Sequence, residues 1–187
     1  MSIFGGFKIE EVKGSVSTLV KAKIGPNNGD KLKVGDKIFF NKSYKTGKLK
    51  KIQFDFDKDN IIRVMKGLQI HYFSKKSQED FFSKEYKITK LTDRMGMRLE
   101  GQKLENIVNK NIKSEGITKG SIQVPGDGQP IILLSDHPTI GGYPKIANVI
   151  TADYDKLVQK TPGTIIKFKL VDLSVAENAF QDYVRKF

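Results

Sequence analysis

The stretch GSIQVPGDGQPIILLSDHPTIGGYPKI, residues 120–146, decides the fold. Five glycines and four prolines separate its short apolar runs. Glycine allows backbone conformations with positive φ and proline fixes φ near about −65°, so this composition is typical of tight turns that join short strands. The stretch therefore predicts a β-rich fold in which turns hold polar groups close together.

A hairpin is expected at the start of this stretch, with strands at 121–124 and 131–134. The loop from Pro125 to Pro130 is rigid and polar, and it places Asp127 and Gln129 at its tip. Such a tip suits a binding site, and it equally suits a loop in which proline and glycine only shape the turn.

A second polar turn follows the hairpin, at Gly141, Gly142, Tyr143 and Lys145. Paired glycines allow backbone amides to approach a ligand closely, and the tyrosine and lysine add hydrogen-bond donors. The pattern is neither a P-loop nor a dinucleotide-binding fingerprint. Ligand binding and a purely structural turn both remain open.

Two arginines four residues apart mark the segment TDRMGMRLEG, residues 92–101. If the segment is extended, Arg94 and Arg98 project from the same side, because side chains repeat every two residues along a strand. Guanidinium groups match the geometry of carboxylate and phosphate, so an anionic ligand would fit. The alternative is an ion pair with Asp93 or Glu100.

Short strands and a few short helices are expected over the rest of the chain. The expected strands are residues 7–12, 18–24, 36–40, 61–65, 86–91 and 164–171. The expected helices start at Ser74 or Ser77 and end at Phe82, run from a capping Asp153 to Lys160, and start at the capping box Ser174-x-x-Glu177. A stripe of helical period in the last helix predicts core packing: Ala176, Ala179, Phe180, Tyr183, Val184 and Phe187.

Residues 41–60 are expected to form a linker. The three strands expected before this linker are too few to close a sheet, so they are expected to need another segment or chain.

Composition excludes several kinds of chemistry. The chain has no cysteine and only His71 and His137, without metal-binding spacing, so no metal site is expected. The net charge of +12 would suit nucleic acid, but the lysines are scattered and lack interleaved aromatics, so a solvated surface is favoured and no nucleic-acid partner is expected. No apolar run reaches the roughly 20 residues of a membrane span and the first residues lack the charged-then-apolar pattern of a signal peptide, so a cytoplasmic protein without a membrane partner is expected.

A series of motifs carries a resemblance to a known family. They are GGF and KGSVST within residues 5–18, LKVGD at 32–36, DRMGMRLEG at 93–101, SEG at 114–116, IQVPGDGQP at 122–130, GGYPKIANVI at 141–150 and QKTPG at 159–163. In this order they resemble the carboxyltransferase-like family that includes the C subunit of 5-oxoprolinase, KipA and proteins labelled allophanate hydrolase subunit 2. Members usually carry about another hundred residues before the GGF motif. Leu68 and Met97 depart from the family pattern, which commonly has proline and tyrosine there.

The resemblance implies a mainly-β fold with two parts. Residues 59–187 would form a cyclophilin-like β-barrel with short helices, and residues 1–58 would form an incomplete β-rich domain plus linker. A cyclophilin-like fold does not imply prolyl isomerase activity.

The resemblance also implies a function. The chain would be the C-type subunit of an ATP-dependent 5-oxoprolinase, inactive alone and working with a KipI-like B-type partner and a LamB/YcsF-like A-type partner. ATP, with Mg²⁺, would be bound by the complex, while biotin would not be carried by this chain because a Met-Lys-Met motif is absent. For this function, Arg94 and Arg98 would bind carboxylate or phosphate and Asp127 would transfer or orient a proton. The expected substrate-binding residues are Gln123, Pro125, Gln129, Gly141, Gly142, Tyr143 and Lys145.

Two other functions fit the same resemblance. One is a biotin-dependent carboxyltransferase component of the urea amidolyase type, with the biotin carrier supplied in trans. The other is a KipA-like regulator that binds the inhibitor of a histidine kinase.

Overall fold

A computed structural model describes residues 5–41, 59–108 and 112–185. The chain divides into two compact units, Met1–Phe54 and Asp55–Phe187. The smaller unit is described by its residues 5–41, and the larger unit contains the strands and α-helices. The expected linker at 41–60 falls almost entirely outside the described residues.

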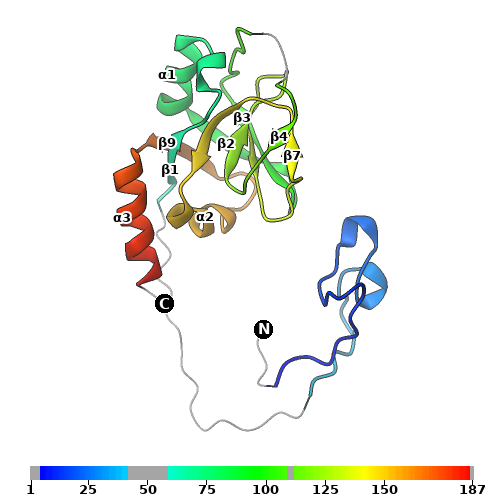
Figure 1. Ribbon diagram of the computed structural model, residues 1–187. Coiled ribbons are helices and arrows are strands. Elements are labelled where there is room, and N and C mark those ends of the chain that lie inside the picture. The colour runs from blue at the N-terminus through cyan, green and yellow to red at the C-terminus, as the bar shows by residue number, and fades with distance from the viewer. Residues whose placement is uncertain (1–4, 42–58, 109–111, 186–187) are drawn as a thin grey trace. The chain divides into compact units, whose positions relative to one another are not determined.

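The larger unit is a closed barrel of seven strands (Figure 1). In spatial order they are β1 (Ile61–Lys66), β8 (Lys145–Val149), β5 (Ser121–Gln123), β6 (Ile131–Leu133), β3 (Gly96–Gly101), β2 (Glu85–Thr92) and β9 (Ile165–Leu170). β1 pairs in parallel with β9, and this pairing closes the barrel, while the other neighbours are antiparallel. The predicted mainly-β barrel is confirmed, and so are the predicted hairpin of β5 and β6 and the strands at β1, β2 and β9.

Side chains alternate between the two faces along each strand, and those that point inward fill the interior of the barrel. Ile122 pairs with Ile132, which pairs with Met97, and all three side chains are buried. At one end of the interior, the rings of Phe81 and Phe168 stack with centroids 4.6 Å apart. Successive residues of a strand point to opposite faces, so the residues next to these inward-pointing ones in sequence point to the outside of the barrel.

Two α-helices of the described residues, α1 and α2, lie at opposite ends of the barrel (Figure 1). α1 (Lys75–Ser83) follows the short 3-10 helix η3 (Ile70–Tyr72), and Ser74 caps it by accepting a hydrogen bond from the amide of Ser77, as predicted. α2 (Thr151–Val158) starts earlier than expected, so the predicted cap at Asp153 is wrong. Asp153 instead lies buried in the first turn, where its carboxylate binds the backbone amide and guanidinium of Arg63.

α3 (Leu173–Val184) differs from its prediction in two ways. Its N-cap is Asp172, which accepts from the amide of Val175 at 2.9 Å, so the predicted capping box at Ser174 is wrong. The apolar stripe is not core either: Ala176 is buried, but Phe180 is 45% and Val184 51% exposed. Phe187 lies outside the described residues. The stripe stays outside because the closed barrel is already filled by its own strands and α3 follows the last of them.

The smaller unit does not form the predicted strands in its described part. Residues 7–12, 18–24 and 36–40 contribute only isolated bridges, such as Phe7 to Phe40 and Leu19 to Ile24, and the 3-10 helix η1 (Val20–Ala22). A second 3-10 helix, η2 (Asn27–Gly29), lies between the last two of these ranges. Positive φ at Lys23 breaks the run 18–24 that the apolar pattern favoured, and positive φ at Lys13 turns the chain directly after the run 7–12. Within residues 5–41 only Gly29 is buried, so this segment has no apolar core of its own.

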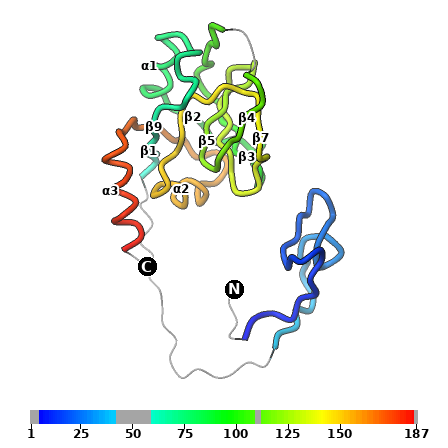
Figure 2. The backbone as a smooth tube through the Cα atoms, viewed as in Figure 1, coloured from blue at the N-terminus to red at the C-terminus, as the bar shows by residue number. Residues whose placement is uncertain are grey.

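Figure 2 traces the backbone of the barrel and of a separate two-stranded sheet at its side. This sheet pairs β4 (Glu115–Gly116) with β7 (Ile140–Gly141), and we call it the side sheet. Its two strands flank β5 and β6 in sequence, so the stretch at 120–146 supplies strands to both the barrel and the side sheet.

Candidate functional site

Four residues align across neighbouring strands on one side of the barrel. Arg98 of β3 pairs with Ile131 of β6, Ile131 pairs with Gln123 of β5, and Gln123 pairs with Lys145 of β8 across a bulge. Directly paired residues of adjacent strands point to the same face, and the neighbours of the first three point inward, so the row lies on the outer face. We call Arg98, Ile131, Gln123 and Lys145 the outer row.

The hairpin tip is attached to the Arg98 end of the outer row. The guanidinium of Arg98 donates to the carboxylate of Asp127, whose other oxygen accepts from the amide of Gln129 at 3.1 Å. The side-chain amide of Gln129 bonds both the N–H and the carbonyl of Gly101, at 3.0 and 3.1 Å. The structure thus brings together the predicted residues Arg98, Asp127 and Gln129. Pro125 closes the turn beside them, where its carbonyl accepts from the amide of Gly128.

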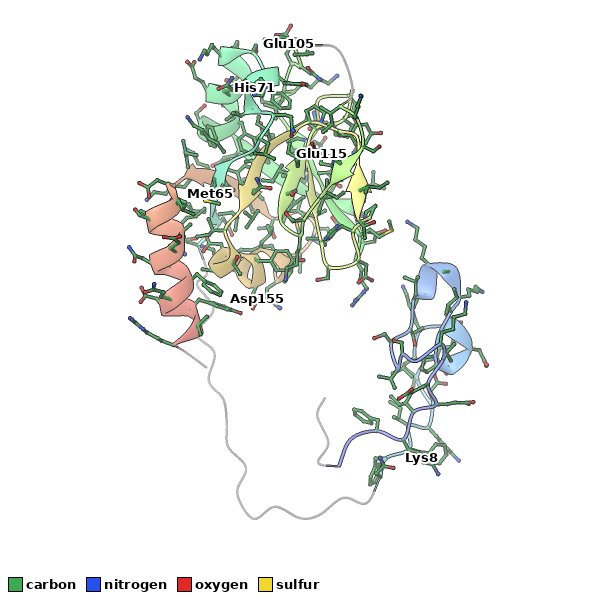
Figure 3. The ribbon with its side chains drawn as sticks, in the orientation of Figure 1. Lys8, Met65, His71, Glu105, Glu115 and Asp155 are labelled. Carbon is green, nitrogen blue, oxygen red and sulfur yellow. The ribbon has the colours of Figure 1, made fainter. Side chains whose placement is uncertain are left out.

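The other end of the outer row is a buried cation. The side chain of Lys145 is only 5% exposed, and its Nζ donates to the carboxylate of Glu115 from the side sheet. Gln69 completes this cluster, since its Nε2 donates to the same Glu115 oxygen at 2.9 Å and its Oε1 accepts from the amide of Lys145 at 3.2 Å. Figure 3 marks Glu115 among the side chains of the barrel unit. Sequence reasoning missed Gln69 and Glu115 as site residues, although the SEG motif contains Glu115 and could have pointed to it.

The glycines of the second polar turn lie beside Gln123. A Cβ atom at Gly141 would be 2.7 Å from Nε2 of Gln123. The same Nε2 donates to the carbonyl of Tyr143 at 3.3 Å, while the carbonyl of Gly142 accepts from Ile112. The predicted residues Gln123, Gly141, Gly142 and Tyr143 are therefore together next to Lys145, and Gly141 permits the close contact of the side sheet with the barrel.

Arg94 is separate from the outer row. The segment 92–101 is not continuously extended, because Asp93 accepts from the amides of Met95 and Gly96 and turns the chain before β3. The guanidinium of Arg94 binds both carboxylate oxygens of Asp136, at 2.6 and 2.9 Å. This contact holds the pKa of Asp136 below its usual value. Ion pairing was the alternative for both arginines, but the partners are Asp136 and Asp127 rather than Asp93 or Glu100.

The pKa of Glu115 is lowered, first by the hydrogen bond from Lys145 and then by that from Gln69. Because the folded-state pKa lies below the unfolded one, these contacts stabilise the fold above the unfolded pKa, and the stabilisation is lost as the pH falls through the folded pKa. We expect an NMR titration of the Glu115 side chain to give a midpoint below 4.5, and Lys145→Met to move that midpoint upward. The control Lys66→Met, on the exposed end of β1, should leave the midpoint in place, and equal midpoints in all three proteins would contradict the contact.

The outer row combines two cations with one side-chain amide on a framework of paired strands, and the carboxylates of Asp127 and Glu115 contact its two ends. Cations and amide donors stabilise anionic groups, and a carboxylate that faces them can accept or orient a proton.

Among the described residues, no three histidine, aspartate or glutamate side chains gather as a metal site. No helix in the described ranges is long and apolar enough to cross a membrane.

Comparisons with known proteins agree with this mainly-β fold and identify the class of domain. The family model for the carboxyltransferase domain, subdomains A and B, matches residues 1–170. The chain belongs to this carboxyltransferase domain family.

Curated relatives span the same region. The chain is 36% identical over 187 residues to the 5-oxoprolinase C subunit of Escherichia coli (strain K12), covering 100% of the chain and 60% of that protein. It is 38% identical over 176 residues to the 5-oxoprolinase C subunit of Haemophilus influenzae, covering 94% of the chain and 57% of that protein. The chain thus spans about three fifths of the length of these relatives.

A solved structure shares the fold over the whole chain. The crystal structure of the K. lactis urea amidolyase matches with a TM-score of 0.79 at 28% identity, over 100% of this chain and 13% of that one. The barrel therefore occurs within a much larger enzyme as well as in proteins named as separate subunits.

Proposed function

We propose that the chain acts as the C-type subunit of an ATP-dependent 5-oxoprolinase, which hydrolyses 5-oxoproline to glutamate. The observation that carries the proposal is the outer row, with its two cations and one side-chain amide, in a chain that matches two proteins named as C subunits of 5-oxoprolinase along nearly its full length. A KipI-like B-type partner and a LamB/YcsF-like A-type partner would complete the enzyme, and the chain alone would be inactive.

The reaction explains why cations and amides are needed. An unstrained lactam is a poor electrophile, and ATP, bound with Mg²⁺ by the complex, would supply a phosphoryl group to activate the lactam oxygen. ADP leaves in this phosphoryl transfer. Water then adds to the lactam carbon and the ring C–N bond breaks, which leaves an acyl phosphate, and a second water hydrolyses the acyl phosphate to glutamate and phosphate. Negative charge develops on oxygen during this addition, so positioned donors lower the barrier.

Each residue of the site receives a role from its surroundings. Arg98 binds the substrate carboxylate or a phosphate, Gln123 donates to the lactam oxygen, and buried Lys145 stabilises the developing charge. Asp127, which Arg98 and the amide of Gln129 hold in place, accepts or orients the proton of the attacking water. Gln129 uses both ends of its amide on Gly101, so it positions the tip.

The remaining predicted residues shape the site. We assign Pro125 to the turn under Asp127, and Gly141, Gly142 and Tyr143 to the loop that closes over the lactam. Arg94, tied to Asp136, lies outside this arrangement and is assigned no contact with the substrate.

A carboxyltransferase function is the second candidate. It is favoured by the likeness to the urea amidolyase structure over the whole chain. In that case the outer row would bind a carboxyl group delivered by a biotin carrier in trans. A KipA-like regulatory role would use the same B-type partner without turnover.

Reconstitution separates these functions. The protein is mixed with its A-type and B-type partners, and ATP hydrolysis and glutamate formation are measured with and without 5-oxoproline. We expect both to depend on 5-oxoproline and on all three proteins. Urea-dependent release of carboxyl groups from biotin would favour the carboxyltransferase, and complex formation without any turnover would favour the regulator.

A further inference from the structure

A groove of about 440 Å³ runs beside the Arg98 end of the outer row. Its walls include Lys90, Thr92, Asp93, Gly96, Arg98 and Ile131, from β2, β3 and β6 and the turn between β2 and β3. The groove therefore adjoins the outer row along two of its members, Arg98 and Ile131. Its volume lies in the range of small-molecule sites.

A bulge in β2 forms one wall of this groove. The pairing of β2 with β3 shifts between Ile88 and Thr92, and Lys90 lies inside the shifted segment. Thr89 fixes the bulge, because its hydroxyl donates to the carbonyl of Arg98 at 2.9 Å and accepts from the amide of Leu91 at 3.2 Å. The hydroxyl of Thr92 in turn donates to the carbonyl of Thr89 at 2.9 Å. Bulges held in this way re-aim side chains, and they are frequent next to binding sites.

The charges around the groove favour an anion. Arg98 has five N–H donors, and the carboxylate of Asp127 engages only one of its nitrogens, so donors remain on a side chain that is 31% exposed. Asp93 also lines the groove, but its Oδ1 accepts from the backbone amides of Met95 and Gly96. Lys90 is exposed and forms no ion pair with another described residue. A small anion between Lys90 and Arg98 would meet two cations.

We propose that this groove is the subsite for the carboxylate of the substrate, with Lys90 and Arg98 as its cations and the hydroxyl of Thr92 at its side. The identity of the ligand as 5-oxoproline rests on the proposed function. Neighbouring strands are roughly 5 Å apart, so the backbones of Arg98 and Gln123, two strands apart, are separated by about 10 Å. A 5-oxoproline carboxylate in the groove would thus leave the lactam ring over Ile131, within reach of Gln123.

Two ligands that differ only in the carboxylate test the subsite on the isolated 187-residue chain. 5-Oxoproline and the neutral lactam 2-pyrrolidinone are titrated separately while backbone amide resonances are followed by NMR. We expect 5-oxoproline to shift the resonances of Thr92, Gly96 and Arg98, and 2-pyrrolidinone to bind at least about tenfold more weakly, as expected when charge-assisted bonds are lost. Equal binding of the two lactams would overturn the proposal.

Lys90→Met removes one cation and keeps the aliphatic stem. We expect it to weaken 5-oxoproline binding about fivefold, the effect of one solvent-exposed ion pair. Lys87→Met is the matched control, because Lys87 is an exposed lysine on the same strand that does not line the groove. Equal effects of the two variants would reject Lys90 as a ligand. If 5-oxoproline binds through its carboxylate but the reconstituted complex shows no turnover, the proposed function is rejected and the subsite is kept. If the complex turns over 5-oxoproline and Lys90→Met leaves that turnover unchanged, the subsite is rejected and the proposed function is kept.

Discussion

Gly67→Ala is expected to destabilise the folded barrel strongly. A Cβ atom at Gly67 would lie 2.3 Å from the carbonyl oxygen of Lys145 and 2.7 Å from the amide nitrogen of Ala147. These are backbone atoms of β8, and the amide of Gly67 itself bonds the carbonyl of Ile146 at 2.8 Å. Neither side can move without breaking strand pairing, so we expect a loss of about 4 kcal/mol or more, which is a large part of a typical domain's stability.

Urea denaturation followed by circular dichroism measures this effect. The matched control is Gly126→Ala at the hairpin tip, where an added Cβ meets no atom within 4 Å. We expect the control to unfold within about 0.5 kcal/mol of the parent chain. A Gly67→Ala protein with the parent's unfolding midpoint would show that β8 does not pack against Gly67 as described.

Lys145→Met should lower 5-oxoproline turnover by the complete complex about 100-fold, as removal of a positioned charge-stabilising donor does in other active sites. The side chain of Lys145 is almost fully buried, so its charge acts in surroundings where it is screened little by water. Methionine keeps the aliphatic volume, and Glu115 is 40% exposed and can turn to water, so we expect the barrel to stay folded.

Two measurements separate a functional role from a structural one. The amide spectrum of Lys145→Met should retain the dispersed pattern of the barrel while kcat falls. Lys66→Met, which removes an exposed lysine from β1, should change neither the amide spectrum nor kcat. Parent-like kcat in Lys145→Met would contradict the role assigned to the buried cation.

Local patterns in the sequence predicted the frame of the site. The hairpin of β5 and β6 followed from its Pro-Gly loop, and β2 and β9 followed from alternation, because side-chain period and turn chemistry are properties of neighbouring residues. The pattern predicted a cap of α1 at Ser74 or Ser77, and Ser74 is the one observed. These elements place Gln123 and Asp127 where the hairpin prediction put them.

Contacts between distant segments were not predictable. Arg94 and Arg98 pair with carboxylates 42 and 29 residues away, and no spacing within the segment 92–101 encodes those partners. The cluster around Lys145 joins Gln69 to Glu115 over 46 residues. Such pairings depend on how the barrel closes and on where the side sheet lies.

Two predictions from apolar patterns, the core-facing stripe of α3 and the strands of the smaller unit, were wrong for the same reason. Periodicity shows that a face is apolar but not whether anything covers it. The stripe on α3 has helical period, yet Phe180 and Val184 stay exposed beside a barrel that is already closed. The apolar runs of the smaller unit likewise form isolated bridges, since strands need paired neighbours that the described residues 5–41 do not supply.

A comparison of Arg98, which belongs to the outer row, with Arg94, which does not, tests most directly whether the outer row is the site of the reaction. Arg98→Met and Arg94→Met are each assembled with the A-type and B-type partners, and 5-oxoproline-dependent ATP hydrolysis is measured. We predict at least about 100-fold lower kcat/KM for Arg98→Met, whereas Arg94→Met, which loses only an exposed pair with Asp136, should stay within about threefold of the parent. Equal losses in both variants, or a larger loss in Arg94→Met, would contradict the outer row as the site of the reaction.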